Sequence, residues 1–204
     1  MVLIVTGGIG SGKSQVCKML VDQYGIPVYE ADRRVKALYT ENPHMLENIE
    51  SALGVALRDD AGIFAAQKLA EVIFSDANSL GKVEEIVFPY LKQDFAAWAE
   101  AQDCEVVAFE SATVLEKPQF EGFGDIVLLI DAPVELRLSR ASLRDGVDEV
   151  AVKRRMAVQN LMNRISDGET CPRVNHVIVN DSTIAELTVK LNEFIEKYGL
   201  TKML

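Results

Sequence analysis

Apolar residues along this chain form two kinds of pattern, short unbroken runs and stripes at helical spacing. Five runs read as β-strands, at residues 2–6, 27–30, 105–110, 125–131 and 176–180. The run at 125–131 is almost wholly apolar, as is typical of a parallel strand covered on both faces. Apolar residues spaced by three and four follow most of these runs and indicate helices. Strands that alternate with helices predict an α/β fold around a parallel sheet.

Residues from about 42 to 103 depart from this alternation. Asn42-Pro43 marks a break, and successive helical stripes follow without a strand-like run. The pattern predicts a helical insertion between the second and third strands. Such an insertion could cover a substrate or could complete the core, and apolar stripes at helical spacing are usually core.

A glycine-rich segment follows the first predicted strand. It reads Gly7-Gly8-Ile9-Gly10-Ser11-Gly12-Lys13-Ser14, and an amphipathic pattern then runs to Gly25. Glycine, four residues and Gly-Lys-Ser form the phosphate-binding loop pattern, which requires a strand before it and a helix after it. Glycines let the backbone curl closely round a phosphate, and inward N–H groups and the helix N-terminus favour an anion. The dinucleotide-binding pattern is excluded because Lys13 stands where a third glycine would be needed.

The loop pattern assigns roles to its last residues. Lys13 is expected to reach the β- and γ-phosphates of ATP, and the Ser14 hydroxyl is expected to hold Mg²⁺. The residues expected to bind ATP here are Gly8, Gly10, Ser11, Gly12, Lys13, Ser14 and Gln15.

Acidic residues follow two of the predicted strands. Ligands of open α/β sheets bind at the carboxyl ends of the strands, where Asp32 and Glu110 fall. Asp32 could orient an acceptor hydroxyl and take its proton, or it could simply cap a helix. Glu110 could be an indirect Mg²⁺ partner, by analogy with the Walker B aspartate, or an exposed carboxylate at a strand end.

Basic residues are concentrated after the strand at 125–131. Arg137, Arg140 and Arg144 share one helical face, and Lys153, Arg154 and Arg155 follow a break at 145–148. We interpret residues from about 140 to 160 as a lid that brings arginines over the transferring phosphoryl group. The alternative is a solvated helical face paired with acidic residues.

Composition narrows the classes of function. The chain has 204 residues and a net charge of −10, which disfavours a protein that coats nucleic acid. No apolar run approaches the length of a membrane span, and the N-terminal run leads into the glycine-rich motif, unlike a signal peptide. Three scattered cysteines and two histidines offer neither zinc spacing nor a disulfide set. We therefore expect reduced thiols and a cytoplasmic protein.

The ordered set of motifs resembles the dephospho-coenzyme A kinase family, over nearly the whole chain. The matching segments are Thr6 to Ser14, Val28-Tyr29-Glu30-Ala31-Asp32, Ile73-Phe74-Ser75-Asp76, Glu110 with Val114-Leu115-Glu116, Asp131-Ala132-Pro133, Arg140 to Arg144-Asp145-Gly146, Arg155 with Gln159, and Val177-Ile178-Val179-Asn180.

The resemblance implies transfer of the ATP γ-phosphoryl group to the ribose 3′-hydroxyl of dephospho-CoA, with Mg²⁺. It implies a three-layer P-loop kinase fold with a parallel five-stranded sheet, in one domain. The core would be residues 1–41 and 104–200, with an acceptor-binding insertion at about 42–103 and a lid at about 140–160. Small-molecule substrates are implied, without nucleic acid or membrane, and the oligomeric state is left open.

The resemblance also carries site residues onto the matching positions. The catalytic residues would be Asp32, Lys13 and Arg140, and Arg144 and Asn180 would join the ATP site. Ser14 and Glu110 would hold the metal, and the acceptor would meet Asp32, Arg33, Pro89 and Glu116.

The chain departs from the family pattern at several positions. Glu30 replaces an aspartate, Gln15 replaces a threonine, Phe88 replaces the histidine before Pro89, and residues 160–175 lack the usual lysine-rich pattern. The same motifs would also suit a kinase of the same architecture with another acceptor, such as a nucleoside. A GTP-dependent switch needs an Asn-Lys-x-Asp guanine reader, which is absent, and a catalytically dead module disagrees with the intact Lys13, Ser14 and Asp32.

Overall fold

The structure is a computed structural model that describes residues 1–200, apart from the side chains of residues 77, 160 and 166. The chain divides into two compact units, which are described separately. The first comprises Met1–Glu30 and the chain from Asp103 onward, and the second comprises Ala31–Gln102. The second unit thus begins at Ala31, whereas the sequence predicted an insertion from about residue 42.

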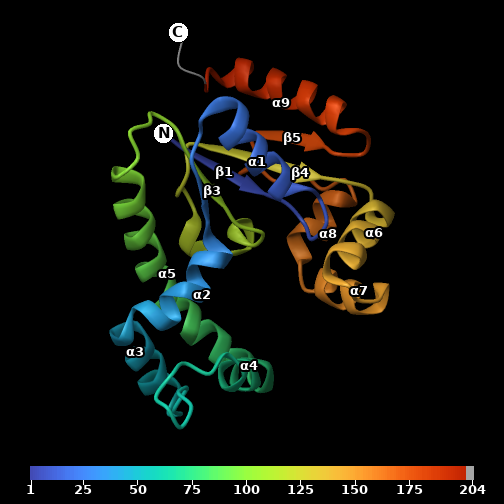
Figure 1. Cartoon of the computed structure of the whole chain (residues 1–204). Coiled ribbons are helices and arrows are strands. Elements are labelled where there is room, and N and C mark those ends of the chain that lie inside the picture. Colours follow the sequence, from blue (N-terminus) through green and yellow to red (C-terminus); the bar gives the residue numbers. More distant parts are fainter. Residues whose placement is uncertain (201–204) are drawn as a thin grey trace. The chain divides into compact units, whose positions relative to one another are not determined.

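A five-stranded sheet forms the centre of the first unit (Figure 1). The strand order is β2-β3-β1-β4-β5, and all the strand pairs are parallel, which confirms the predicted α/β fold. The strands are β1 (Val2–Thr6), β2 (Val28–Glu30), β3 (Val107–Glu110), β4 (Ile126–Asp131) and β5 (His176–Val179).

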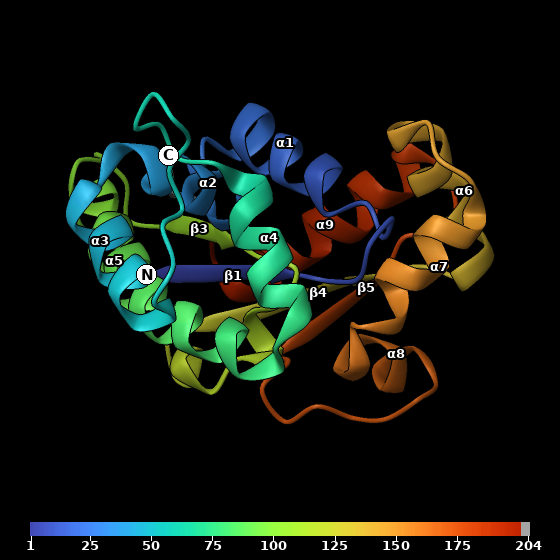
Figure 2. The same cartoon turned by 90° about the horizontal axis from the view of Figure 1, so that it is seen from below.

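Helices α1 (Lys13–Tyr24) and α9 (Ile184–Tyr198) pack on one face of this sheet (Figure 2). Successive side chains of β1 point to opposite faces of the sheet, so Leu3 and Val5 lie on the same face and join the apolar cluster under α1 and α9. On the other face the rings of Phe109, Phe120 and Phe123 pack together, with centroids 5.0–5.7 Å apart. The short 3₁₀ helices η1 (Val114–Glu116) and η2 (Pro118–Phe120) supply part of that face.

Three further helices lie between β4 and β5. They are α6 (Val134–Asp145), α7 (Glu149–Ala157) and α8 (Asn160–Ser166). Helix α8 was not predicted, and Pro133 is the N-cap of α6.

The second unit is helical, as its apolar spacing predicted. An ion pair joins α2 to α5, because Arg34 donates to both carboxylate oxygens of Asp94 at 2.7 and 2.8 Å. Pro89 lies inside α5, and an isolated bridge between Arg58 and Phe64 is a short extended element that the sequence did not indicate. The helices are α2 (Ala31–Glu41), α3 (Pro43–Leu53), α4 (Ala66–Ser75) and α5 (Ala77–Glu100). Within residues 1–200, no helix has both the length and the apolar character needed to cross a membrane.

Candidate functional site

The glycine-rich segment forms a tight loop between β1 and α1. Gly7, Gly10 and Gly12 have φ angles of 150°, 76° and 100°, which side chains with a Cβ rarely adopt. Gly12 is the N-cap of α1 and accepts hydrogen bonds from the backbone N–H groups of Gln15 and Val16. The loop therefore leads directly into the positive end of a helix, where an anion is favoured.

Lys13 and Ser14 are the first two residues of that helix. The Lys13 ammonium donates to the carbonyl oxygens of Gly7 at 2.7 Å and Gly8 at 3.2 Å. These contacts hold the positive charge beside the loop that the pattern assigns to a phosphate. Ser14 is exposed, so its hydroxyl is accessible to a ligand.

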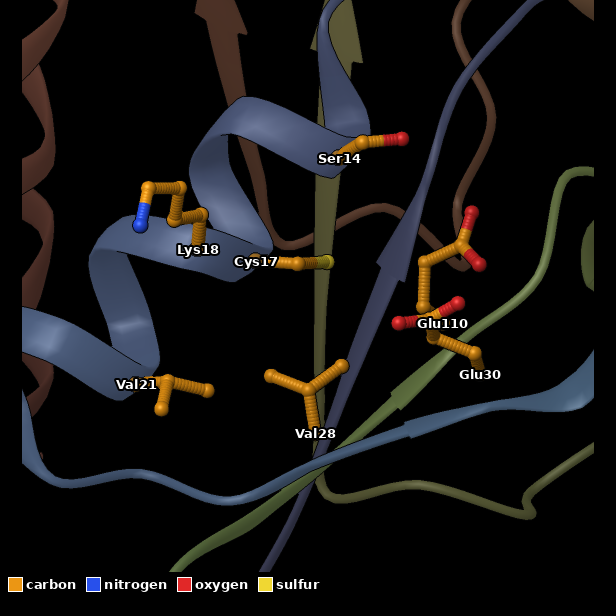
Figure 3. Close-up of a pocket in the computed structure, with 7 residues that line it drawn as sticks. All are labelled: Ser14, Cys17, Lys18, Val21, Val28, Glu30 and Glu110. Carbon is orange, nitrogen blue, oxygen red and sulfur yellow. The ribbon is translucent and has the colours of Figure 1, made fainter.

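A cavity of about 200 Å³ opens beside Ser14. Glu30 ends β2, Glu110 ends β3, and the two residues are register partners in the parallel sheet. Figure 3 shows both carboxylates turned into the cavity near the Ser14 hydroxyl, while the Lys18 side chain runs away from them. The other residues that line the cavity are Cys17, Val21 and Val28.

The field in this cavity favours a cation. Burial raises the pKa of the Cys17 thiol well above its usual value, and the charges of Glu110 and Glu30 raise it further. A hydroxyl and carboxylates are the oxygen ligands that Mg²⁺ prefers, and Mg²⁺ usually keeps several waters and takes only one or two protein carboxylates. In the described part of the chain no three His, Cys, Asp or Glu side chains are grouped to enclose a metal ion. The donor set at Ser14 and Glu110 therefore fits Mg²⁺ held jointly with a nucleotide.

Asn180 supports the loop from the end of β5. It is 8% exposed, its backbone N–H donates to Asp131 O at 2.7 Å, and its side-chain amide donates to Ser11 O at 2.9 Å. A Cβ at Gly12 would collide with that amide, so the glycine lets Asn180 approach the loop. Arg140 donates to the Asn180 carbonyl at 3.0 Å. Arg140, expected to be catalytic, is thus tied to a residue that itself holds the loop.

The arginines of α6 differ in exposure, although their spacing places them on one helical face. Arg144 is exposed and bonded to Asp145, which also accepts from Arg155 at 2.7 Å. These hydrogen bonds, first from Arg144 and then from Arg155, lower the pKa of the Asp145 carboxyl. Arg137, in contrast, is fully buried and donates to Ile9 O at 3.0 Å. The three side chains therefore have three different surroundings.

The residues expected at the acceptor fall on both units. Asp32 and Arg33 are exposed in the first turn of α2, and Pro89 is exposed on α5. Glu116 lies in η1 of the first unit, with its Oε1 atom buried and without a hydrogen-bond partner among the described residues. Their acceptor-binding roles remain predictions.

Three residues of the site were not predicted as such. Glu30 was expected at the end of the second strand, beside the γ-phosphate, but was given no role, and in the structure it shares the cavity with Glu110. Arg137 was grouped with the lid, although its position beside Leu138 and Ala141 on the buried stripe of α6 was a signal of burial. Gln159 accepts a hydrogen bond from Ile9 N at 2.9 Å, and the sequence offered no spacing rule that would single out this pairing.

Comparisons with known proteins agree with this geometry. The family model described as dephospho-CoA kinase matches residues 1–186. A dephospho-CoA kinase of Porphyromonas gingivalis is 37% identical over 155 residues, which cover 76% of this chain and 75% of that protein. The crystal structure of TT1252 from Thermus thermophilus is similar with a TM-score of 0.79 at 25% identity, over 97% of each chain. A dephospho-CoA kinase structure from Campylobacter jejuni shares the fold, with a TM-score of 0.66 at 22% identity over 97% of this chain and 96% of that one. This chain therefore belongs to the dephospho-CoA kinase family.

Proposed function

We propose that this protein transfers the γ-phosphoryl group of ATP to the ribose 3′-hydroxyl of dephospho-CoA, which gives CoA and ADP in the last step of CoA biosynthesis. The observation that carries the proposal is the glycine loop with Lys13 bonded to its carbonyls, next to a cavity lined by Ser14 and the carboxylates of Glu30 and Glu110. Family membership gives the acceptor its identity. The protein acts on two small molecules, and its free thiols Cys17, Cys104 and Cys171 agree with a reducing compartment such as the cytoplasm.

The first unit supplies the donor side of the reaction. Backbone N–H groups of the loop cradle the phosphates of ATP, and the Lys13 ammonium moves from the Gly7 and Gly8 carbonyls to the β- and γ-phosphates. Asn180 keeps the loop in shape, and Arg140 and Arg144 supply positive charge near the phosphates. Because Arg137 and Gln159 both bond to Ile9, the segment of the proposed lid is tied to the loop at both of its ends.

Ser14 and Glu110 would hold Mg²⁺, Ser14 directly and Glu110 through water or directly, with Glu30 adding negative charge to the same cavity. Mg²⁺ bound there would neutralise charge on the β- and γ-phosphate oxygens.

The acceptor side is assigned to Asp32, Arg33, Pro89 and Glu116. The Asp32 carboxylate accepts the proton of the ribose 3′-hydroxyl, so that the oxygen can attack the γ-phosphorus. Arg33 supplies charge for the acceptor's phosphates, and Pro89 and Glu116 contact the rest of that molecule.

Neutralising Glu110 tests the metal assignment. We expect Glu110→Gln to raise the Mg²⁺ concentration for half-maximal turnover by about tenfold, because one charged ligand contact is worth about 1.4 kcal/mol or more. Binding of ADP should become less dependent on Mg²⁺ in the variant, as measured by titration calorimetry with and without the metal. Glu121→Gln, at an exposed position outside the cavity, is the matched control. An unchanged Mg²⁺ requirement in Glu110→Gln would remove this residue from the metal site.

Release of ADP with different acceptors tests the function itself. We expect ATP turnover to be stimulated by dephospho-CoA and to give a product phosphorylated at the 3′ position, identified by mass spectrometry and phosphorus NMR. A panel of nucleosides and shikimate should give no stimulation above the rate with ATP alone. Stimulation by a nucleoside and not by dephospho-CoA would assign the same donor site to a different acceptor.

A further inference from the structure

The tip of the phosphate loop is held at three points by the segment that follows β4. The backbone N–H of Ile9 donates to Gln159 Oε1 at 2.9 Å, and the Ile9 carbonyl accepts from Arg137 Nε at 3.0 Å. The Ile9 side chain packs against an apolar cluster of α6 and α7. That cluster is Leu138, Ala141, Val152 and Met156. Two successive peptide groups of the loop and the side chain between them are therefore fixed by residues outside it.

Arg137 is the central member of this support. Its side chain is 0% exposed, and its Nη1 atom lies 4.0 Å from a carboxylate oxygen of Asp131. Burial lowers the pKa of the Arg137 guanidinium, and the charge of Asp131 acts in the opposite direction. Its burial and these two contacts oppose a shift of the guanidinium, since protein interiors are closely packed.

This buried side chain gives Gly8 and Gly10 different reasons to be glycine. Gly8 does not have a left-handed φ, so its backbone would accept alanine, but a Cβ there would collide with the Arg137 guanidinium. Gly10 has a φ of 76°, and a Cβ there would collide with the main-chain carbonyl of Arg137. Truncating the Arg137 side chain would thus make room at position 8 and not at position 10.

We propose that Arg137 is a positioning residue of the phosphate loop, and that position 8 must be glycine to admit its guanidinium. The inference rests on the proposed function, because the affinity it concerns is that of the ATP site. It goes beyond that function by assigning an α6 residue the task of shaping the loop.

The experiment compares Gly8→Ala, Gly10→Ala and Arg137→Ala with the two double variants that combine each glycine change with Arg137→Ala. Titration calorimetry measures the affinity for MgADP without any acceptor, and steady-state kinetics measure the KM for ATP and for dephospho-CoA. We expect each single change to weaken MgADP binding by about tenfold or more, as for the loss of one charge-assisted contact. The KM for dephospho-CoA should stay within about twofold of wild type, a factor near the ~0.5 kcal/mol typical of changes outside a site.

The double variants decide between positioning and general damage. Gly8→Ala with Arg137→Ala should bind MgADP no more weakly than Arg137→Ala alone, because the added methyl group occupies the vacated space. In Gly10→Ala with Arg137→Ala, the two losses of MgADP affinity should multiply, because the main-chain carbonyl of residue 137 still collides with a Cβ at position 10. If the changes only destabilise the protein, the losses of MgADP affinity would multiply in both double variants, and that result would overturn the proposal. A Gly8→Ala variant that binds MgADP as tightly as wild type would also overturn the proposal.

Two arrangements keep the test decisive. If circular dichroism shows that Arg137→Ala does not fold, Arg137→Met takes its place, since methionine keeps the apolar stem and lacks the Cζ and Nη2 atoms that come nearest to a Cβ at position 8. If wild type binds MgADP but does not phosphorylate dephospho-CoA, the proposed function fails while the coupling between positions 8 and 137 is still measured. The positioning role would be refuted, whatever the acceptor, if Gly8→Ala weakened MgADP binding by the same factor in wild type and in the Arg137→Ala background.

Discussion

Lys13→Ala is expected to lower kcat/KM for ATP by on the order of 10³-fold or more, because it removes a donor aimed at charge that develops in the transition state. In the structure the ammonium is bonded to the Gly7 and Gly8 carbonyls, so it is held at the loop before any phosphate arrives. When it turns to the β- and γ-phosphates, it neutralises the oxygen charge on the group being transferred and on the group left behind. Coupled release of ADP, measured at saturating dephospho-CoA and varied ATP, gives the loss.

Two matched changes separate this effect from a loss of charge or of stability. Lys197→Ala removes a lysine from the last turn of α9, outside the cavity, and should leave kcat/KM unchanged. Lys13→Arg keeps the charge and should remain strongly impaired, because a rigid guanidinium does not fit the place of a compact ammonium. Lys13→Ala should keep the far-ultraviolet circular dichroism of wild type. Activity within tenfold of wild type in a folded Lys13→Ala protein would refute the assignment of the loop.

The sheet could be predicted because its strands carry their own signal. The run that became β4 is apolar at nearly every position, and a parallel strand covered on both faces needs this composition. Helix α9 could be predicted for a similar reason, because residues next to it mark its ends. Thr183 accepts a hydrogen bond from Glu186 N at its start, and Gly199 ends it with a left-handed φ. Local rules gave no such boundary for the second unit. It begins at Ala31 because α2 packs with the other helices of that unit, and the Arg34–Asp94 ion pair between α2 and α5 joins residues 60 positions apart.

The candidate site was predictable where chemistry follows from a contiguous motif, as at residues 7–14. It was less predictable where distant segments converge on the motif. Arg137 and Gln159 meet Ile9 across 128 and 150 positions, and no spacing rule spans such separations. Glu30 is at the cavity because β2 and β3 are neighbours in register, although they lie far apart in sequence. The burial of Arg137 could not be predicted from the arginine spacing on α6. Helical spacing gives a shared face but does not say whether that face is solvated or buried.

Asp32→Asn is expected to lower kcat by about 10²- to 10⁴-fold, the usual contribution of a positioned general base. The amide keeps the size of the side chain and can still accept a hydrogen bond, but it does not take a proton from a hydroxyl. Asp32 lies in the first turn of α2 and two residues beyond the end of β2. The residues expected to hold ATP belong to the other compact unit, so the affinity for MgADP should stay within about twofold of wild type.

The competing explanation is that Asp32 only stabilises the start of its helix. Asp32 lies inside the first turn of α2, where the lost interaction with the helix dipole costs about 0.3–1 kcal/mol. A loss of this size would change the thermal midpoint slightly and kcat very little. Glu186→Gln makes the same kind of change in the first turn of α9 and should leave kcat intact. Rapid-quench measurement of the first turnover with bound ATP and dephospho-CoA isolates phosphoryl transfer from product release. A first turnover as fast as that of wild type in Asp32→Asn would assign the proton of the acceptor hydroxyl to another group and leave Asp32 a helix-stabilising residue.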